Sequence, residues 1–253
     1  MGFKGSLIRS GGDAKTIKGN DVYETAIMYL APADLALPGR TVCPMAKSAG
    51  CIAGCLNSAG RGAFSNVQLA RINKTKRYFA DRALFMADLA ADLERFVRYC
   101  AKRGVKPAVR LNGTSDIQWE VGHSVTRMVH GFPAYSSSVF EAFPEVQFYD
   151  YTKIAKRVRR ELPTNYTLVL SYSEASPSYA ETIAATAAET GANVAVVFRD
   201  KATRDAYMAT GYQWRTVIDG DQTDMRFLDP KGVVVGLYAK GKAKGDTSGF
   251  VVG

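Results

Sequence analysis

The sequence lacks the motifs that identify several common classes of enzyme and of membrane protein. It contains no P-loop, no nucleophile elbow and no HExxH pair, so it gives no sign of a P-loop nucleotidase, an α/β-hydrolase or a zincin. Its first residues include no apolar stretch long enough for a signal peptide. No later segment approaches the roughly 18 consecutive apolar residues of a membrane span. These absences predict a cytoplasmic protein with no membrane partner.

Histidine and cysteine are both scarce, with two and four residues in the chain. His123 and His130 are seven residues apart, so we expect them on one helical face, too distant to chelate one metal ion. Disulfides are rare in a reducing cytosol, where clustered cysteines indicate metal binding or catalysis instead. Three cysteines lie within thirteen residues. The fourth, Cys100, lies on the apolar face of a predicted helix, and we expect it to be a core residue.

The composition is that of an ordinary globular domain, with 47% apolar and 23% charged residues among 253. Lysine and arginine exceed aspartate and glutamate by 33 to 24, a formal charge of +9. Such an excess favours a nucleotide or nucleic acid as partner, although a basic protein without an anionic ligand fits it equally well. The densest basic stretches lie at residues 71–77, 153–160 and 240–244.

Strand-like and helix-like segments alternate about six times along the chain, which predicts an α/β fold with a parallel sheet and helical crossovers. Apolar runs predict strands at residues 24–31, 108–111, 146–150, 166–170, 193–198, 215–218 and 232–238. Helices are expected from residue 66, at 81–103, 139–143, 154–162 and 177–191, and between 200 and 211. We therefore expect a single domain, residues 21–253, built as a partial (β/α)6 barrel-like sheet. A flexible N-terminal arm, residues 1–20, is expected to precede it.

A loop of about thirty residues follows the first predicted strand, and loops of that length are usually functional. Its part at residues 41–62 carries Cys43, Cys51 and Cys55 in the spacing C-x7-C-x3-C. Thiolates are preferred ligands of zinc and of iron–sulfur clusters. Three of them leave one iron of a cluster, or one position of a zinc ion, open to a small molecule. An iron–sulfur cluster, a zinc ion and a loop without a ligand are all compatible with this pattern.

Polar side chains gather directly after the predicted strands, where parallel α/β proteins build their sites. The candidates for catalysis are Asp116, Lys153 and Glu174. Lys153 is suited to hold a carboxylate or phosphate, or else simply begins the basic helix. Arg199 follows the fifth strand as a candidate for cofactor binding, with an ion pair to Asp200 as the alternative.

The order of a first strand, a loop with three cysteines and successive β/α units resembles the partial barrel of radical S-adenosylmethionine enzymes. The resemblance implies that the three cysteines hold a [4Fe-4S] cluster whose open iron takes the amino and carboxylate groups of S-adenosylmethionine. It also implies that residues after the second and fourth strands contact this cosubstrate, here Asn112, Gly113, Thr114 and Ser115, then Ser171, Ser173 and Glu174. A redox-active cluster would need an electron donor as a partner.

The cysteine loop, residues 112–116 and the segment 236–250 also resemble a bacteriophage family related to the gene product 88 proteins. This resemblance implies a phage protein that works in the host cytoplasm. Taken together, the sequence predicts an iron–sulfur enzyme that acts on a nucleotide or a substrate derived from nucleic acid. The alternative is a non-enzymatic phage protein that is stabilised by zinc or a cluster and binds nucleic acid.

Overall fold

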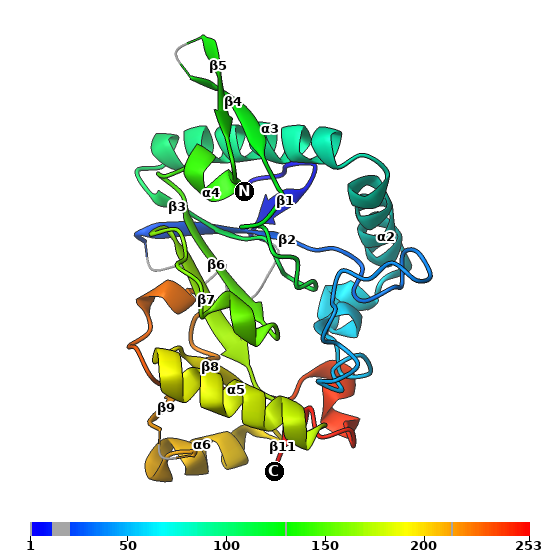
Figure 1. Cartoon of the computed structure of the whole chain (residues 1–253), viewed down its shortest axis with the longest axis vertical. Coiled ribbons are helices and arrows are strands. Elements are labelled where there is room, and N and C mark those ends of the chain that lie inside the picture. Colours follow the sequence, from blue (N-terminus) through cyan, green and yellow to red (C-terminus); the bar gives the residue numbers. More distant parts are fainter. Residues whose placement is uncertain (1, 12–20, 130, 214) are drawn as a thin grey trace.

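A single mixed sheet of nine strands forms the centre of the molecule (Figure 1). The computed structural model describes residues 2–11, 21–129, 131–213 and 215–253. The strands are β1 (Ile8–Ser10), β2 (Tyr23–Met28), β3 (Lys106–Arg110), β4 (Val125–Val129), β5 (Phe132–Ser136), β6 (Gln147–Thr152), β7 (Tyr166–Ser171), β8 (Val194–Phe198), β9 (Val217–Asp219), β10 (Val234–Tyr238) and β11 (Val251–Val252). All but β4 and β5 belong to the central sheet.

The strand order of the sheet is β1-β2-β3-β6-β7-β8-β10-β9, with β11 also beside β8. Within the described part of the chain, β1 runs antiparallel to β2, and the other pairs of this sheet are parallel. The predicted mixture of helices with a mostly parallel sheet is confirmed. Among the described residues the sheet does not close on itself, so the finer expectation of a (β/α)6 barrel is not seen.

Strands β7 and β8 overlap only briefly, because β7 ends where the pairing with the first residues of β8 has just begun. They pair only through the register Leu170 with Val194 and Ser171 with Ala195. Beyond that point, β8 pairs on the same side with β11, through Val197 and Phe198. The strand β11 therefore occupies the place that β7 leaves, and it brings the C-terminal segment to the carboxyl edge of the sheet.

Two groups of helices lie at opposite ends of the sheet (Figure 1). The helices are α2 (Ser65–Ala80), α3 (Arg82–Lys102), α4 (Val139–Ala142), α5 (Pro177–Thr190) and α6 (Lys201–Thr210). Short 3-10 turns are η1 (Leu56–Ser58), η2 (Gly60–Ala63), η3 (Ala155–Arg157), η4 (Arg226–Leu228) and η5 (Gly241–Gly245). None of the helices in these ranges is long and apolar enough to cross a membrane.

The long helix α3 forms where the three- and four-residue spacing of apolar side chains predicts it. The carboxylate of Asp81 accepts a hydrogen bond from the Leu84 N–H and caps its first turn. The side chains of Leu89, Leu93 and Cys100 on its apolar stripe are fully buried. The prediction that Cys100 is a core residue is therefore confirmed.

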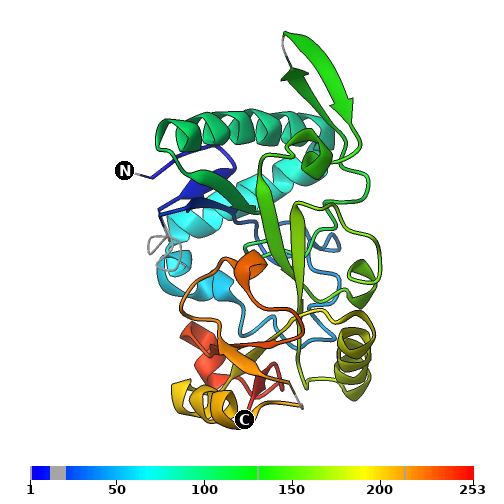
Figure 2. The same ribbon diagram turned by 90° about the vertical axis from the view of Figure 1, so that its left-hand side faces the viewer.

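A hairpin of β4 and β5 projects from the body of the molecule, past α3 (Figures 1 and 2). It was not predicted, because most of its large apolar side chains are exposed. Phe132 is 75% exposed and Tyr135 is 73% exposed, while Val125 is buried. The expectation that His123 and His130 share a helical face is wrong, since the strand β4 of the hairpin begins at Val125, two residues after His123. His130 lies outside the described residues.

Two further expectations differ from the structure. The basic helix expected at residues 154–162 is wrong, because only the short turn η3 forms there and Arg157 points into the core. The described part of the expected N-terminal arm forms β1, in which Ile8 is fully buried. The carboxylate of Asp92 on α3 holds this segment by accepting hydrogen bonds from the N–H groups of Leu7 and Ile8. Residues 12–20 of the expected arm lie outside the described residues.

Candidate functional site

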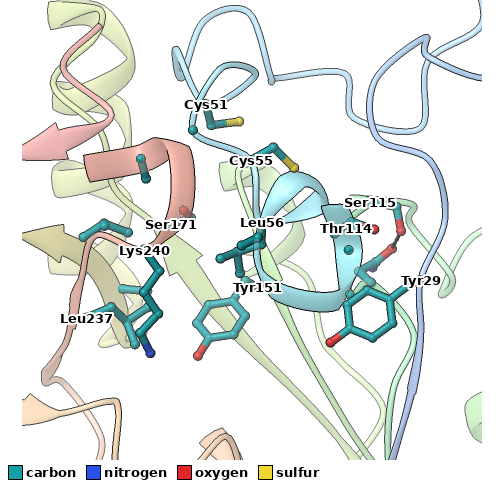
Figure 3. A pocket seen from close by; sticks show the side chains of 18 of the residues that line it. Tyr29, Cys51, Cys55, Leu56, Thr114, Ser115, Tyr151, Ser171, Leu237 and Lys240 are labelled. Atoms are coloured by element: carbon teal, nitrogen blue, oxygen red, sulfur yellow. Dashed lines mark hydrogen bonds between the residues drawn. The ribbon is translucent and has the colours of Figure 1, made fainter. Parts of the chain in front are cut away.

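A cavity of about 740 Å³ lies at the carboxyl ends of the parallel strands (Figure 3). Its lining includes the cysteine loop, the loop after β3 and the first residues after β6. The opposite wall comes from β8, β10 and the C-terminal segment, through Val197, Leu237 and Phe250. Segments from the whole length of the chain therefore meet at the edge of the sheet where the sequence places the polar residues.

All three clustered cysteines line this cavity. Each is a free, half-buried thiol. The Sγ atoms of Cys43 and Cys51 lie 3.7 and 3.8 Å from the carbonyl oxygens of Thr114 and Ala46 and donate to them. The Sγ of Cys55 accepts a hydrogen bond from the Asn57 N–H and caps η1. The loop thus turns all three thiols towards one space, and Figure 3 shows Cys51 and Cys55 over one end of it.

The thiols of Cys43 and Cys55 are held in their neutral form in this arrangement. Burial raises the pKa of Cys43 to about 12 and also raises the pKa of Cys55. Within the described ranges, no three His, Cys, Asp or Glu side chains are close enough together to hold a metal ion. The three cysteines share one cavity, but their sulfurs are not gathered around one point.

Lys153 lines the same cavity as the three cysteines and interacts electrostatically with all of them. Burial lowers the pKa of this lysine, but Cys51, Asp116 and the other two cysteines raise it by more, so that the pKa lies above its ordinary value. Its Nζ lies 5.6 Å from the ring centroid of Phe250, and it forms no ion pair with any described residue. An ammonium group that forms no ion pair with a described residue therefore lines the same cavity as the thiols.

The loop after β3 lines the cavity as expected, but the side chain of Asn112 serves the loop itself. Its Oδ1 accepts hydrogen bonds from Ser115 Oγ, from the Ile117 N–H and from Trp119 Nε1. A side chain at Gly113 would place a Cβ 2.7 Å from the Met28 carbonyl oxygen and from the Tyr29 ring. Glycine is therefore required at this position by the close approach of the strand β2.

Asp116 reaches the cavity wall with its carboxylate already engaged. It accepts hydrogen bonds from Thr152 Oγ1, from the Lys153 N–H and from Arg157 Nη1, at 2.7 to 2.9 Å. The fully buried Arg157 side chain also binds both carboxylate oxygens of Glu120 at 2.8 Å. This ionic network fixes the loop after β3 against the loop after β6.

The network continues away from the cavity into the core. Arg157 Nη2 donates to the Tyr166 hydroxyl at 2.8 Å, and that hydroxyl donates to Asp150 Oδ2 at 3.0 Å. Asp150 also accepts from the Asn112 N–H at 2.7 Å. Burial raises the pKa of Asp150 to about 7, although the hydrogen bond from Asn112 and the charges of Arg110 and Arg157 favour its ionised form.

The predicted residues after β7 and β8 reach the cavity only in part. Ser171 lines it. The Ser173 hydroxyl instead donates to the Ala49 and Gly249 carbonyl oxygens, Glu174 accepts from the Tyr212 hydroxyl, and Arg199 donates to the Asp246 and Gly253 carbonyl oxygens. These three residues hold the C-terminal segment in place and do not line the cavity.

Several lining residues were not predicted as site residues, among them Tyr29, Arg61, Arg71, Arg110, Asp224 and Lys240. Arg110 pairs with Asp224 at 3.1 Å in a nearly buried ion pair. Lys240 pairs with Asp221 at 2.6 Å. For Arg71 and Lys240, the only indication in the sequence was their position at the start of a basic stretch. The acidic cluster around residues 219–224 supplies partners for Arg110, Arg204 and Lys240.

The family model described as gene product 88 matches residues 6–253 of the chain. No curated protein and no solved structure matches it.

Proposed function

We propose that this chain, which belongs to the phage-related gene product 88 family, is an iron–sulfur enzyme resembling radical S-adenosylmethionine proteins. The single observation that carries the proposal is the shared cavity. Three thiols from one loop open into it at the carboxyl ends of the parallel strands, where α/β enzymes build their sites. The cysteine loop follows β2, the first strand of the parallel series.

The strand order supports the comparison with a partial barrel. Strands β2, β3, β6, β7 and β8 are neighbours in the sheet in the same order as in the chain. An open doubly wound sheet would reverse its order within such a run. Long helices occupy the connections from β2 to β3 and from β7 to β8, while the connection from β6 to β7 contains only the short turn η3 among the described residues. The proposed architecture is therefore a barrel-like sheet that stays open between β1 and β9.

The chemistry of the cavity also supports a thiolate-bound group. Cys43, Cys51 and Cys55 would hold a [4Fe-4S] cluster, which, when bound, would supply an electron to its cosubstrate. Three thiolates around such a cluster carry a net negative charge, and the unpaired ammonium of Lys153 lies where it would offset that charge. Loading requires the thiols to lose their protons, because the thiolate and not the thiol is the ligand.

S-adenosylmethionine is the cosubstrate that belongs to this proposal. Thr114, Ser115 and Ser171 line the cavity and would contact the bound S-adenosylmethionine. Asp116 is a positioning residue in the proposal, since its carboxylate orients the Lys153 backbone and the loop after β3. Ser173, Glu174 and Arg199 are left out of it, because they bind the C-terminal segment.

The experiment is anaerobic purification with cluster reconstitution, followed by analysis of iron, sulfide and zinc. We expect about four irons and four sulfides per chain and a broad absorption band that bleaches with dithionite. Cys43→Ala, Cys51→Ala and Cys55→Ala should each lose the iron. Cys100→Ala is the matched control, because this thiol lies in the core away from the cavity, and it should keep the iron.

Two outcomes would count against the proposal. One zinc per chain and no iron would refute the radical enzyme and support the alternative of a zinc-stabilised phage protein that binds nucleic acid. A reconstituted protein with neither metal would show that the cysteine loop has a structural role only.

A further inference from the structure

The charges that line the cavity do not balance. Three lining carboxylates already have cationic partners: Asp116 pairs with Arg157, Asp221 with Arg204 and Lys240, and Asp224 with Arg110. The lining also contains five cationic side chains, namely Arg61, Arg71, Arg110, Lys153 and Lys240. Within the described part of the chain, only Arg110 and Lys240 of these five form ion pairs. The cavity therefore presents a surplus of positive charge.

Arg71 is the most informative of the three cations without an ion pair. Its side chain comes from α2, and the residue is only 7% exposed. Burial without a carboxylate lowers its pKa, because desolvation disfavours the charged form. Its Nε is buried and has no hydrogen-bond partner. A buried guanidinium with an unused donor is costly unless an anion completes it.

The surrounding residues fix the orientation of this guanidinium. Arg71 Nη1 donates to Asn57 Oδ1 at 2.6 Å and to the Asn57 carbonyl oxygen at 3.1 Å. The Tyr29 ring lies against the other side, with its centroid 4.7 Å from Cζ. A Cβ on Gly62 would lie 3.0 to 3.2 Å from both terminal nitrogens, so the chain passes closely over them. The fork is held in place before any ligand arrives.

We infer that this cavity binds the oxyanion of a small molecule, a phosphate or a carboxylate, through Arg71, with Arg61 as a second cation at its rim. Arg61 lies on η2 and is exposed, yet it lines the same cavity. Arginine is well suited to this task, because its planar fork binds both kinds of oxyanion through paired hydrogen bonds. The volume of about 740 Å³ leaves room for the rest of a nucleotide-sized molecule.

This site does not depend on a cluster. Arg61 lies on η2 and Arg71 on α2, and an arginine needs no metal ion to bind an oxyanion. The test therefore uses cluster-free, chelator-treated protein. Pyrophosphate and succinate serve as the two probes, titrated by calorimetry at low ionic strength. Binding of pyrophosphate alone would identify a phosphate ligand and binding of succinate alone a carboxylate ligand, and either supports the inference.

Arg71→Gln should weaken the bound probe about tenfold or more, the loss expected for a charge-assisted hydrogen bond. Arg61→Gln should weaken it by a smaller factor. Arg159→Gln is the matched control, since that arginine pairs with Glu189 on the surface and does not line the cavity, and it should bind like the wild type. Circular dichroism checks that each variant is folded.

The inference is wrong if the wild type binds neither probe at millimolar concentration. It is also wrong if Arg71→Gln and Arg61→Gln both bind like the wild type. Should Arg71→Gln fail to fold, Arg61→Gln alone decides, because an exposed arginine can be changed without loss of the fold. A protein that binds pyrophosphate but never iron would refute the cluster and leave this inference standing.

Discussion

Substitution of Asp150 by asparagine is expected to change how the stability of the protein depends on pH. The Asp150 side chain is fully buried, and burial raises the pKa of its carboxyl to about 7 from 3.8 in the unfolded chain. The folded state therefore holds this proton more tightly than the unfolded state does. The stability that the group contributes is complete below pH 4 and is lost as pH rises through 7.

The magnitude follows from these two pKa values. Between pH 5 and pH 8, the contribution of Asp150 to the free energy of unfolding should fall by about 3 kcal/mol, because a tenfold difference in proton affinity between the folded and unfolded states corresponds to about 1.36 kcal/mol. That is a large part of the roughly 5–15 kcal/mol by which a domain is stable. Asparagine cannot titrate, so Asp150→Asn lacks this component.

Urea unfolding of wild type and Asp150→Asn at several pH values between 5 and 8 measures the effect. In the difference between the two free energies of unfolding, the contributions of the other titrating groups cancel. This difference should change by about 3 kcal/mol in favour of the variant as pH rises from 5 to 8. Two parallel curves would show that Asp150 stays ionised in the fold. In that case the charges of Arg157 and Arg110, and not burial, would control its protonation.

Two further substitutions test the loops that shape the cavity. Arg157→Met should cost about 3–5 kcal/mol in urea unfolding, because it leaves the Asp116 and Glu120 carboxylates buried without a cation; Arg159→Met, which breaks only an exposed pair, should cost less than about 1 kcal/mol. Equal losses in the two would mean that the buried network contributes no more than a surface pair. Gly113→Ala should cost about 1–3 kcal/mol, since the new Cβ meets the Met28 carbonyl and the Tyr29 ring, whereas Gly245→Ala has open space and should be neutral within about 0.5 kcal/mol. A neutral Gly113→Ala would show that β2 and the loop after β3 can move apart.

The elements that could be predicted from the sequence are those whose signal is local. The apolar stripe of α3 and the apolar run of β8 are buried as their periodicity indicates. The turn η3 could not be predicted, because Arg157 is drawn inward by Asp116 and Glu120, about forty residues earlier in the chain. The hairpin of β4 and β5 was missed for a different reason, since most of its large apolar side chains are exposed and so do not mark a buried face.

In the candidate site, too, the residues that could be predicted are those with a local signal in the sequence. The cysteines and residues 113–116 could be placed at one edge of the sheet because each follows a strand that runs in the same direction. Arg71 and Lys240 enter the lining from α2 and from the C-terminal segment, and only the packing of distant segments brings them there. Ser173 and Glu174 follow a strand as expected. The segment before β11 packs against them, however, and both bind the Gly249 carbonyl oxygen instead of lining the cavity.

The position of β11 beside β8 has a consequence for the order in which the cavity is built. The Ser248 hydroxyl donates to the Gly50 carbonyl oxygen across 198 residues of sequence, so the ribosome makes the cysteine loop long before the segment that packs against it. Phe250, which directly precedes β11, is one of the residues that line the cavity. The part of the wall that contains it is therefore added only after the strands β2 to β10 have all been synthesised.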